Sequence, residues 1–242
     1  MKISFVIPAY NEEKLIGACL ESVQKEIART QADAEIIVVN NASTDRTKEV
    51  ASLFSGVRIV DEARKGLTRA RQAGLMASSG ELIANVDADT KLPEGWLTTV
   101  MREFAHDPSL VALSGPFIYY DLSAYERVLV RIFYEIGSFI QNVLHAGVYL
   151  QGGNFVLRRD ALMRAGGFDI TIEFYGEDTD IARRMKRQGR MEWTFALPMY
   201  TSGRRLREEG VFNTGMRYAA NFFWTTIHGK PLSKTYTDVR SE

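Results

Sequence analysis

The chain has 242 residues, with 30 Lys or Arg, 30 Asp or Glu and a formal net charge of zero. A balanced charge argues against a general polyanion binder, so we expect no nucleic-acid partner. Hydrophobic residues make up 45% and charged residues 25% of the chain, which is typical of a globular protein with a real core. The single cysteine, Cys19, excludes an internal disulfide.

The first half of the chain alternates strands and helices. The predicted elements are strands at residues 3–8, 35–39, 57–60 and 82–87, with helices at 12–28 and 67–78 between them. Asn11 is expected to cap the first helix, with Glu12 and Glu13 in its favourable first turn. Strands separated by helices predict crossover connections and therefore a parallel sheet.

The pattern changes beyond Pro93. The predicted elements are a strand at 110–118, a long amphipathic helix at 123–144 and a helix at 177–189. Ser123 and Glu126 form a capping box at the start of the long helix. We expect its apolar stripe to dock on the rest of the chain, although such a stripe also suits peripheral contact with a membrane.

The first strand and the apolar segments also bear on location. The N-terminal residues read as a strand and lack the apolar core of a signal peptide. No stretch approaches the ~20 uncharged apolar residues that cross a bilayer. We therefore expect a cytoplasmic protein.

Two carboxylates separated by one residue, Asp87 and Asp89, come directly after a short buried strand that ends at Val86. They stand at the carboxyl end of a core strand, which is the edge where ligands of open α/β sheets bind. Oxygen ligands at this spacing suit a hard divalent cation that is also bound to a diphosphate. The alternative is a strand-to-turn junction in which Asp89 only caps the next segment of the chain.

The turn after the first strand, residues 9–13, contains no glycine. A dinucleotide-binding turn needs glycine for close approach to a pyrophosphate, and a Walker loop needs Gly-Lys-Ser or Gly-Lys-Thr. Both kinds of site are therefore disfavoured. A metal on Asp89 is the remaining candidate for holding phosphates.

Short motifs succeed one another in a characteristic order. They are Val-Ile-Pro-Ala-Tyr-Asn-Glu at 6–12, Val-Val-Asn-Asn-Ala-Ser-Thr-Asp at 38–45, Lys-Gly at 65–66, Ala-Arg-Gln-Ala-Gly at 70–74, Ser-Gly-Glu at 79–81, Asp-Ala-Asp at 87–89, Gly-Gly-Asn-Phe at 152–155, Arg-Arg at 158–159, Gly-Gly-Phe-Asp at 166–169 and Gly-Glu-Asp-Thr-Asp at 176–180. In this order and spacing the chain resembles the family 2 glycosyltransferases over roughly residues 3–190.

The resemblance implies an α/β fold of GT-A type: a mostly parallel, Rossmann-like central sheet flanked by helices, with a helical second half. It implies one domain over 1–242, in which 1–121 bind the nucleotide sugar, and 122–242 form an acceptor-binding half with a C-terminal helical segment. The implied activity is inverting transfer of a sugar from an NDP-sugar to a glycan or lipid-linked acceptor, such as a cell-envelope polysaccharide. Mg²⁺ or Mn²⁺ is the implied cofactor.

Carried over by position, the resemblance assigns the nucleotide-sugar contacts to Pro8, Ala9, Tyr10, Glu12, Asn41, Lys65, Gly66, Arg71, Asp87 and Ala88. Asn41 stands where many relatives have an aspartate that reads the base; the amide loses charge and gains a donor, so the base stays open. Arg71 alternatively belongs to the exposed face of an amphipathic helix. Asp89, together with Asp87, is the implied metal site.

Glu177 and Asp178 match the family's acidic pair on the acceptor side, where the aspartate is the general base for the attacking hydroxyl. Both acids also begin a predicted helix, where capping alone would favour them. The implied acceptor-binding loop is Gly152, Gly153 and Asn154. Further candidates are Arg204 and Arg205 as a clamp on the diphosphate and His228 as a third metal ligand.

Two other functions stay open at the level of the sequence. A non-catalytic module that binds a nucleotide sugar is disfavoured, because both the metal-type and the base-type carboxylates are present. A sugar nucleotidyltransferase is disfavoured by the missing glycine-rich first loop. The oligomeric state is left open.

Overall fold

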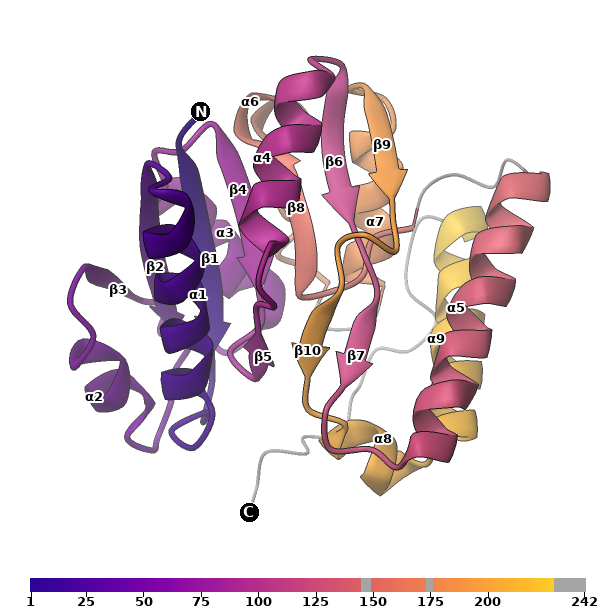
Figure 1. Cartoon of the computed structure of the whole chain (residues 1–242), viewed down its shortest axis with the longest axis horizontal. Helices are drawn as coiled ribbons and strands as arrows, with labels where there is room; N and C mark the ends of the chain where they lie inside the picture. The colour runs from indigo at the N-terminus through magenta and orange to yellow at the C-terminus, as the bar shows by residue number, and fades with distance from the viewer. Residues whose placement is uncertain (145–148, 173–175, 229–242) are drawn as a thin grey trace.

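The computed structural model describes residues 1–144, 149–172 and 176–228. Its centre is a seven-stranded sheet in the order β3-β2-β1-β4-β8-β6-β9, to which both halves of the chain contribute (Figure 1). The strands are β1 (Ile3–Ala9), β2 (Ala34–Asn40), β3 (Val57–Asp61), β4 (Leu82–Val86), β6 (Leu110–Ser114), β8 (Asn154–Arg158) and β9 (Arg190–Trp193).

Neighbouring strands of this sheet are parallel except at β8, which runs antiparallel to both β4 and β6. The mostly parallel α/β sheet predicted from the sequence is therefore confirmed. Because β1 to β4 are parallel, their carboxyl ends meet at one edge, and antiparallel β8 begins at that same edge. The loops after these strands consequently converge.

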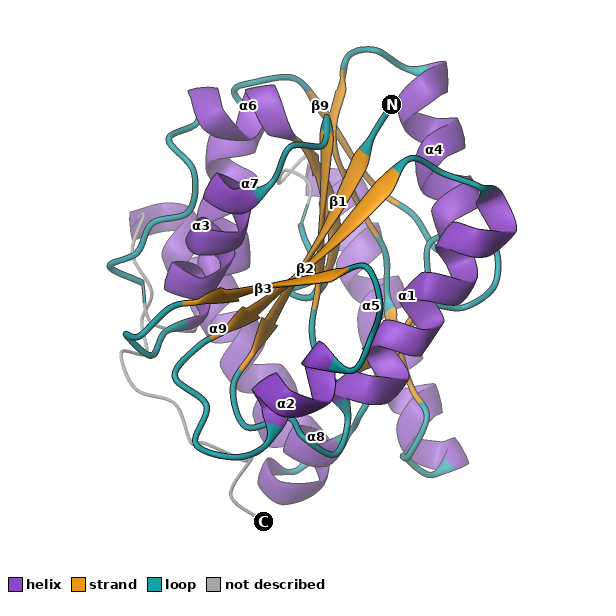
Figure 2. Ribbon diagram, turned by 90° about the vertical axis from the view of Figure 1, so that its left-hand side faces the viewer, coloured by secondary structure: helices purple, strands orange, loops and turns teal. Residues whose placement is uncertain are grey.

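Helices cover both faces of the sheet (Figure 2). One face carries α1 (Ile16–Thr30) and α4 (Trp96–His106), and the other carries α3 (Leu67–Ala77), α6 (Arg159–Arg164) and α7 (Glu177–Met185); α2 (Thr47–Ser52) lies beside α1. In β1, Phe5 and Ile7 join the core beneath α1 and α4, whereas Val6 joins the core beneath α3 and α7. Burial on both faces explains why these strands are almost entirely apolar.

A second, three-stranded sheet has the order β5-β10-β7. Its strands are β5 (Thr90–Lys91), β7 (Phe117–Tyr119) and β10 (Met199–Thr201). The chain continues from β10 into the helices α8 (Arg204–Glu209) and α9 (Val211–His228). The prediction of one strand over 110–118 is wrong, because Gly115 and Pro116 separate β6 from β7. Pro116 has no N–H for a strand ladder, and a Cβ on Gly115 would overlap the Leu197 carbonyl.

The first helix begins later than predicted. Asn11 has a φ of 51° and accepts a hydrogen bond from the Thr44 N–H, so it does not cap α1, whose N-cap is Leu15. The expected cap is wrong because residues 12–16 first form a turn, in which the N–H of Ile16 donates to the Glu12 carbonyl. Glu12 is thereby left at the sheet edge where the strands end.

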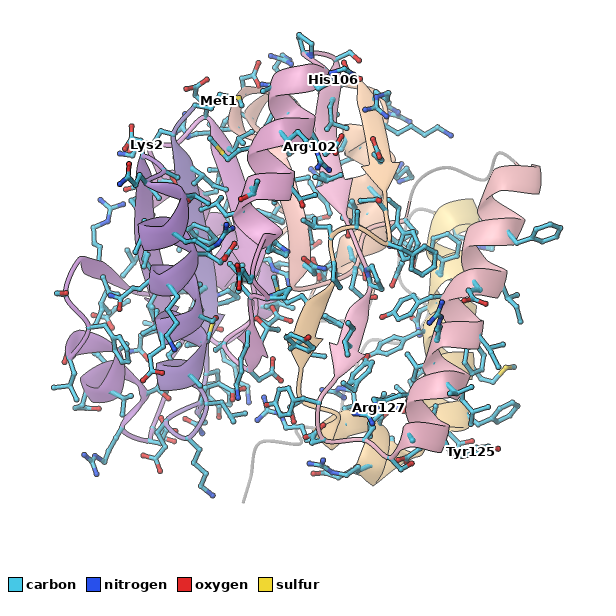
Figure 3. The ribbon with its side chains drawn as sticks, in the orientation of Figure 1. Met1, Lys2, Arg102, His106, Tyr125 and Arg127 are labelled. Atoms are coloured by element: carbon cyan, nitrogen blue, oxygen red, sulfur yellow. The ribbon has the colours of Figure 1, made fainter. Side chains whose placement is uncertain are left out.

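The long helix α5 (Ala124–Leu144) stands with α9 beside the small sheet. Its predicted capping box is confirmed, since the Ser123 N–H and hydroxyl donate to Glu126 Oε2 at 2.9 and 2.7 Å. The apolar stripe was expected to dock on the rest of the chain, but much of it is exposed. Its exposed residues are Tyr125, Val128, Ile132, Phe133, Ile136 and Phe139. Figure 3 shows Tyr125 pointing away from the molecule.

Some predictions on the second half reach beyond the described parts. The side chains of Ile140, Val143 and Leu144 and the residues 229–242 of the expected C-terminal segment lie outside them. The helix predicted over 177–189 ends at Met185. Of the helices that are described, none is both long and apolar enough to cross a bilayer.

Candidate active site

The loop after β4 carries Asp87 and Asp89 at the shared sheet edge. A tight turn closes this loop, because the N–H and the hydroxyl of Thr90 both donate to the Asp87 carbonyl, at 3.1 and 2.7 Å. Ala88 between them is buried. The two carboxylates therefore meet different partners, Asp87 a residue of α3 and Asp89 a residue of α8.

Arg71 of α3 is completely buried and holds carboxylates from two distant parts of the chain. Its Nη2 lies 3.2 Å from Asp87 Oδ1, and its Nη1 forms an ion pair with Oε1 of Glu177, the first residue of α7. The alternative of an exposed Arg71 is wrong. One guanidinium thus joins the end of β4 to the start of α7.

The backbone of Gly152 and Gly153, just before β8, runs between these acidic groups. Gly153 has a φ of 81°, and a Cβ there would overlap the Asp87 carboxylate. A Cβ on Gly152 would lie 3.3 Å from Glu177 Oε1 and 3.6 Å from Asp178 Oδ2. At position 153 only glycine leaves room for the Asp87 carboxylate, and at position 152 the backbone lies close to the two acids of α7.

Asn154 does not share the position of the two glycines. It is completely buried, its Nδ2 donates to the carbonyls of Gly115 and Leu197 at 3.0 and 2.9 Å, and its Oδ1 accepts from Trp96 Nε1 at 3.0 Å. The amide of Asn154 thus fastens loops to the start of β8, and a contact of Asn154 with the acceptor stays a prediction.

Glu177 and Asp178 begin α7, but Gly176 is its N-cap, so neither acid serves as the cap. Burial raises the pKa of Glu177 to about 7 against the attraction of Arg71, and the neighbouring Asp178 adds to the rise. Burial likewise raises the pKa of Asp178, although its Oδ1 accepts the Thr179 N–H at 2.7 Å. Carboxylates in such surroundings are suited to proton transfer near neutral pH.

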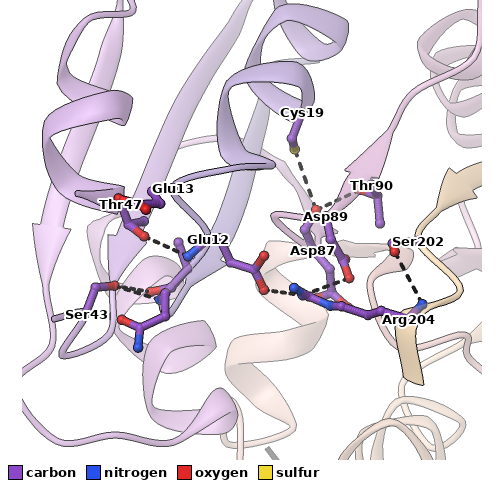
Figure 4. Close-up of polar contacts among 12 residues, drawn as sticks. Glu12, Glu13, Cys19, Ser43, Thr47, Asp87, Asp89, Thr90, Ser202 and Arg204 are labelled. Carbon is purple, nitrogen blue, oxygen red and sulfur yellow. Dashed lines mark hydrogen bonds and ion pairs between the residues drawn. The ribbon is translucent and has the colours of Figure 1, made fainter. Parts of the chain in front are cut away.

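Arg204 of α8 bridges Glu12 and Asp89 (Figure 4). Its Nη2 lies 3.1 Å from Asp89 Oδ2 and also pairs with Oε1 of the buried Glu12. Burial opposes the charge of Arg204, but Asp89 and Glu12 together raise its pKa. The antiparallel pairing of Thr201 in β10 with Thr90 in β5 brings Arg204 to this place.

The two other C-terminal candidates have partners of their own. Arg205 pairs with Glu209 within α8 at 3.1 Å, and the His228 ring stacks on Trp224 at 3.9 Å near the end of α9. Across residues 1–144, 149–172 and 176–228, no three His, Cys, Asp or Glu side chains are gathered to hold a metal. His228 is therefore not brought together with two other such side chains in these parts of the chain.

The donor set at the sheet edge nevertheless fits a hard divalent cation. Mg²⁺ and similar ions are commonly bound by one or two carboxylates, with substrate phosphates and water completing the shell. Asp89 and Asp87, partly exposed at the ends of the converging loops, supply such carboxylates. A cation bound to Asp89 would either share the carboxylate with Arg204 or displace Arg204 from it.

The residues assigned to the nucleotide by position lie along the same edge. Pro8 and Ala9 are buried at the end of β1, and the Lys65 Nζ lies 3.8 Å from the centre of the Tyr10 ring. Gly66 immediately precedes α3, which carries Arg71. The positions thus stand at the ends of neighbouring strands of the sheet, whose order is β2-β1-β4.

Asn41, just after β2, uses its amide to hold the next loop. Its Nδ2 donates to the carbonyls of Glu62 and Arg64 at 3.2 and 2.8 Å, and its Oδ1 accepts the Gly66 N–H at 2.8 Å. An aspartate could not donate to either carbonyl. The amide at this position therefore has a structural reason.

We expect Asn41→Asp to lower the free energy of unfolding by about 1–3 kcal/mol, because a buried carboxylate would face two carbonyls without a proton to offer. Thermal unfolding followed by circular dichroism measures the loss. Asn213→Asp, on the exposed surface of α9, is the matched control and should leave the melting temperature unchanged. Equal stability of the two variants would contradict the loop-holding role of Asn41.

The model of Glycosyl transferase family 2 matches residues 4–166 of the chain. Glycosyltransferase GlyA of Streptococcus pneumoniae is 28% identical over 140 residues, which are 55% of this chain and 20% of GlyA. The chain matches 26% and 33% of the length of two further curated glycosyltransferases. It thus spans a third or less of these relatives.

Two solved structures share the fold at low sequence identity. Glucosyl-3-phosphoglycerate synthase of Mycobacterium tuberculosis, in complex with Mn²⁺, UDP and glucosyl-3-phosphoglycerate, has a TM-score of 0.66 and 22% identity, covering 96% of this chain and 81% of that one. The mannosyltransferase PcManGT of Pyrobaculum calidifontis, in complex with GDP-Man and Mn²⁺, has a TM-score of 0.66 and 21% identity, covering 89% and 64%. With the family match extending over most of its length, the chain belongs to glycosyl transferase family 2 and has the GT-A fold.

Proposed function

We propose that the chain transfers a sugar from a nucleoside-diphosphate sugar to a hydroxyl acceptor, with inversion at the anomeric carbon. The observation that carries the proposal is the contact of Arg71 with both Asp87 and Glu177. It brings the acids after β4 and the acids of α7 to one place, as displacement across a single carbon requires. The complexes of the two structural neighbours with UDP, GDP-Man and Mn²⁺ support a donor of this class.

On the donor side, the ends of β1 and β2 and the start of α3 would bind the nucleoside, and Asp87 would face the ribose and the sugar. Asp89, with Asp87, would hold Mg²⁺ or Mn²⁺. When bound, the cation supplies stabilisation of the charge that grows on the leaving diphosphate. Arg204, already beside Asp89, is placed to bind diphosphate oxygens.

On the acceptor side, Asp178 would accept the proton of the attacking hydroxyl. A Cβ on Gly152 would lie 3.6 Å from the Oδ2 of Asp178, so this oxygen lies beside a glycine backbone that an acceptor could approach. Attack opposite the departing diphosphate inverts the anomeric carbon, and Glu177 would help to hold the acceptor. The exposed apolar stripe of α5 supports an acceptor that is lipid-linked or lies close to a membrane.

A thermal-shift panel of nucleoside diphosphates and NDP-sugars, with and without Mn²⁺, tests the proposal. A ligand at ~100 times its Kd stabilises a protein by about 2.7 kcal/mol, which for a chain of this size raises Tm by roughly 5–10 °C. We expect such a rise for one base, and only with the cation. Absence of any rise over the whole panel would contradict the proposal; binding without transfer to any acceptor would favour a non-catalytic module.

A further inference from the structure

The side chain of Arg71 is completely buried. Its guanidinium lies among side chains from the loop after β4, the start of α7 and β8. Asp87 Oδ1 and Glu177 Oε1 take one terminal nitrogen each, and the Phe155 ring of β8 lies 5.1 Å from the guanidinium carbon. Both carboxylates raise the pKa of Arg71 despite its burial, so it stays charged. The cluster contains one guanidinium for two carboxyl groups.

Stability alone does not account for this cluster. Arg71 Nε and Glu177 Oε2 are buried and make no hydrogen bond to any residue within the described parts of the chain. Burying charges is unfavourable, and replacing a buried ion pair by packed apolar residues is often neutral or stabilising. The docking of α3 is already provided by Ala70, Gly74 and Leu75, which pack in the apolar core beneath the helix.

The geometry leaves little freedom between the two carboxylates. Two nitrogens of one rigid, planar group fix the separation of Asp87 and Glu177, which the flexible single ammonium of a lysine cannot do. The backbone at Gly153 presses on Asp87, and that at Gly152 lies beside Glu177. A displacement of either carboxylate must therefore shift the position of the other.

We propose that Arg71 is a positioning residue that couples the two sides of the site, holding the donor-side Asp87 and the acceptor-side Glu177 as one unit. Occupation of the donor site then sets the position of Glu177 and of its neighbour Asp178. The inference rests on the proposed function, since it needs a nucleotide sugar at Asp87. Coupling between sites is reciprocal, so a change at Glu177 must also alter donor binding.

The test is a double-mutant cycle in which donor binding, and not activity, is measured. Calorimetry gives the Kd of the NDP-sugar that the panel identifies, with Mn²⁺, for the wild type, Glu177→Gln, Arg71→Lys and the double variant. Glu177→Gln is expected to weaken binding about five-fold or more, because a neutral amide holds the guanidinium less strongly, and the guanidinium then pulls Asp87 out of place. In the Arg71→Lys background the same change should alter the Kd by less than about two-fold.

Lysine keeps the positive charge, so any through-space effect of the Glu177 charge is the same in both backgrounds. Asp178→Asn is the matched control. It removes the negative charge of the residue next to Glu177, and Arg71 forms its ion pair with Glu177 and not with Asp178. We expect Asp178→Asn to change the Kd by the same factor in both backgrounds. Equal effects of Glu177→Gln in both backgrounds, or coupling of the same size for Asp178→Asn, would overturn the positioning role while leaving the proposed function intact.

Folding is checked by melting temperature before the cycle is evaluated. Arg71→Gln serves as a second background if the lysine variant does not fold. Failure of both to fold would make Arg71 a requirement of the fold and overturn the proposal. If the wild type binds no nucleotide sugar with either cation, the proposed function itself fails, which is distinguishable from loss of the coupling alone.

Discussion

Replacing Asp178 with asparagine is expected to lower kcat by a factor on the order of 10²–10⁴, the usual contribution of a general base. Asparagine keeps the size of the side chain and the acceptor oxygen that binds the Thr179 N–H, but it cannot take a proton from the acceptor hydroxyl. The fold should be retained. The measurement is kcat at saturating donor and acceptor, with Tm recorded on the same preparation.

Asp160→Asn is the control for the Asp178 variant. Asp160 is an exposed acid on α6 that pairs with Arg164, and exposed ion pairs contribute about 0–1 kcal/mol to stability. The same substitution there should leave both kcat and Tm in place. Full turnover by Asp178→Asn would show that Asp178 is not the base. A fall in Tm alongside the fall in kcat would show that Asp178 supports the fold instead.

The identity of the base also fixes the direction of the pH dependence. Burial raises the pKa of Glu177 to about 7 and raises that of Asp178 above its ordinary value. Since a base must be ionised to accept a proton, kcat should be low in acid and rise as pH increases through the titration of the pair. Glu177→Gln removes the titration near 7, so the rising limb should move to lower pH.

The fold and the edge that carries the site could be predicted from local patterns. Apolar strands alternating with helices are sufficient to predict a parallel sheet, and a parallel sheet places residues after its strands at one edge. Asp87 and Asp89 could be located in this way because they come directly after the strand that ends at Val86. The prediction of a helix cap at Asn11 is wrong because the Asn11 side chain instead accepts a hydrogen bond from the Thr44 N–H, in a left-handed backbone conformation.

The contacts that complete the site could not be predicted, because they depend on pairing between distant segments. The Gly-Gly-Asn run reads locally as a turn, and nothing nearby reveals that β8 enters the sheet antiparallel and buries Asn154. In the sequence, Arg71 lies at a position that suits the exposed face of an amphipathic helix. In the structure α7 covers this position, and Glu177 pairs with Arg71. Arg204 reaches Asp89 only through the β10–β5 register, for which its own neighbourhood gives no signal.

Asp89→Asn is expected to lower kcat/KM by a factor on the order of 10³, the upper range for removing one electrostatic contact to developing charge. The amide retains one oxygen but loses the charge that attracts a divalent cation. The fold should survive, because Arg204 still pairs with Glu12. The measurement is the Kd for Mn²⁺, read from the spin-resonance signal of the free ion in the presence of the nucleoside diphosphate, alongside the rate.

Asp61→Asn separates the metal site from a general effect of charge at this edge. Asp61 ends β3, next to β2 in the same sheet, and its exposed carboxylate pairs with Lys48 at 2.7 Å. Both variants therefore remove one negative charge at a strand end, but only Asp89 lies in contact with Arg204 and in the loop of Asp87. We expect weaker Mn²⁺ binding for Asp89→Asn alone. Equal Mn²⁺ affinity in the two variants would mean that the cation is held elsewhere, and the diphosphate would then rest on Arg204.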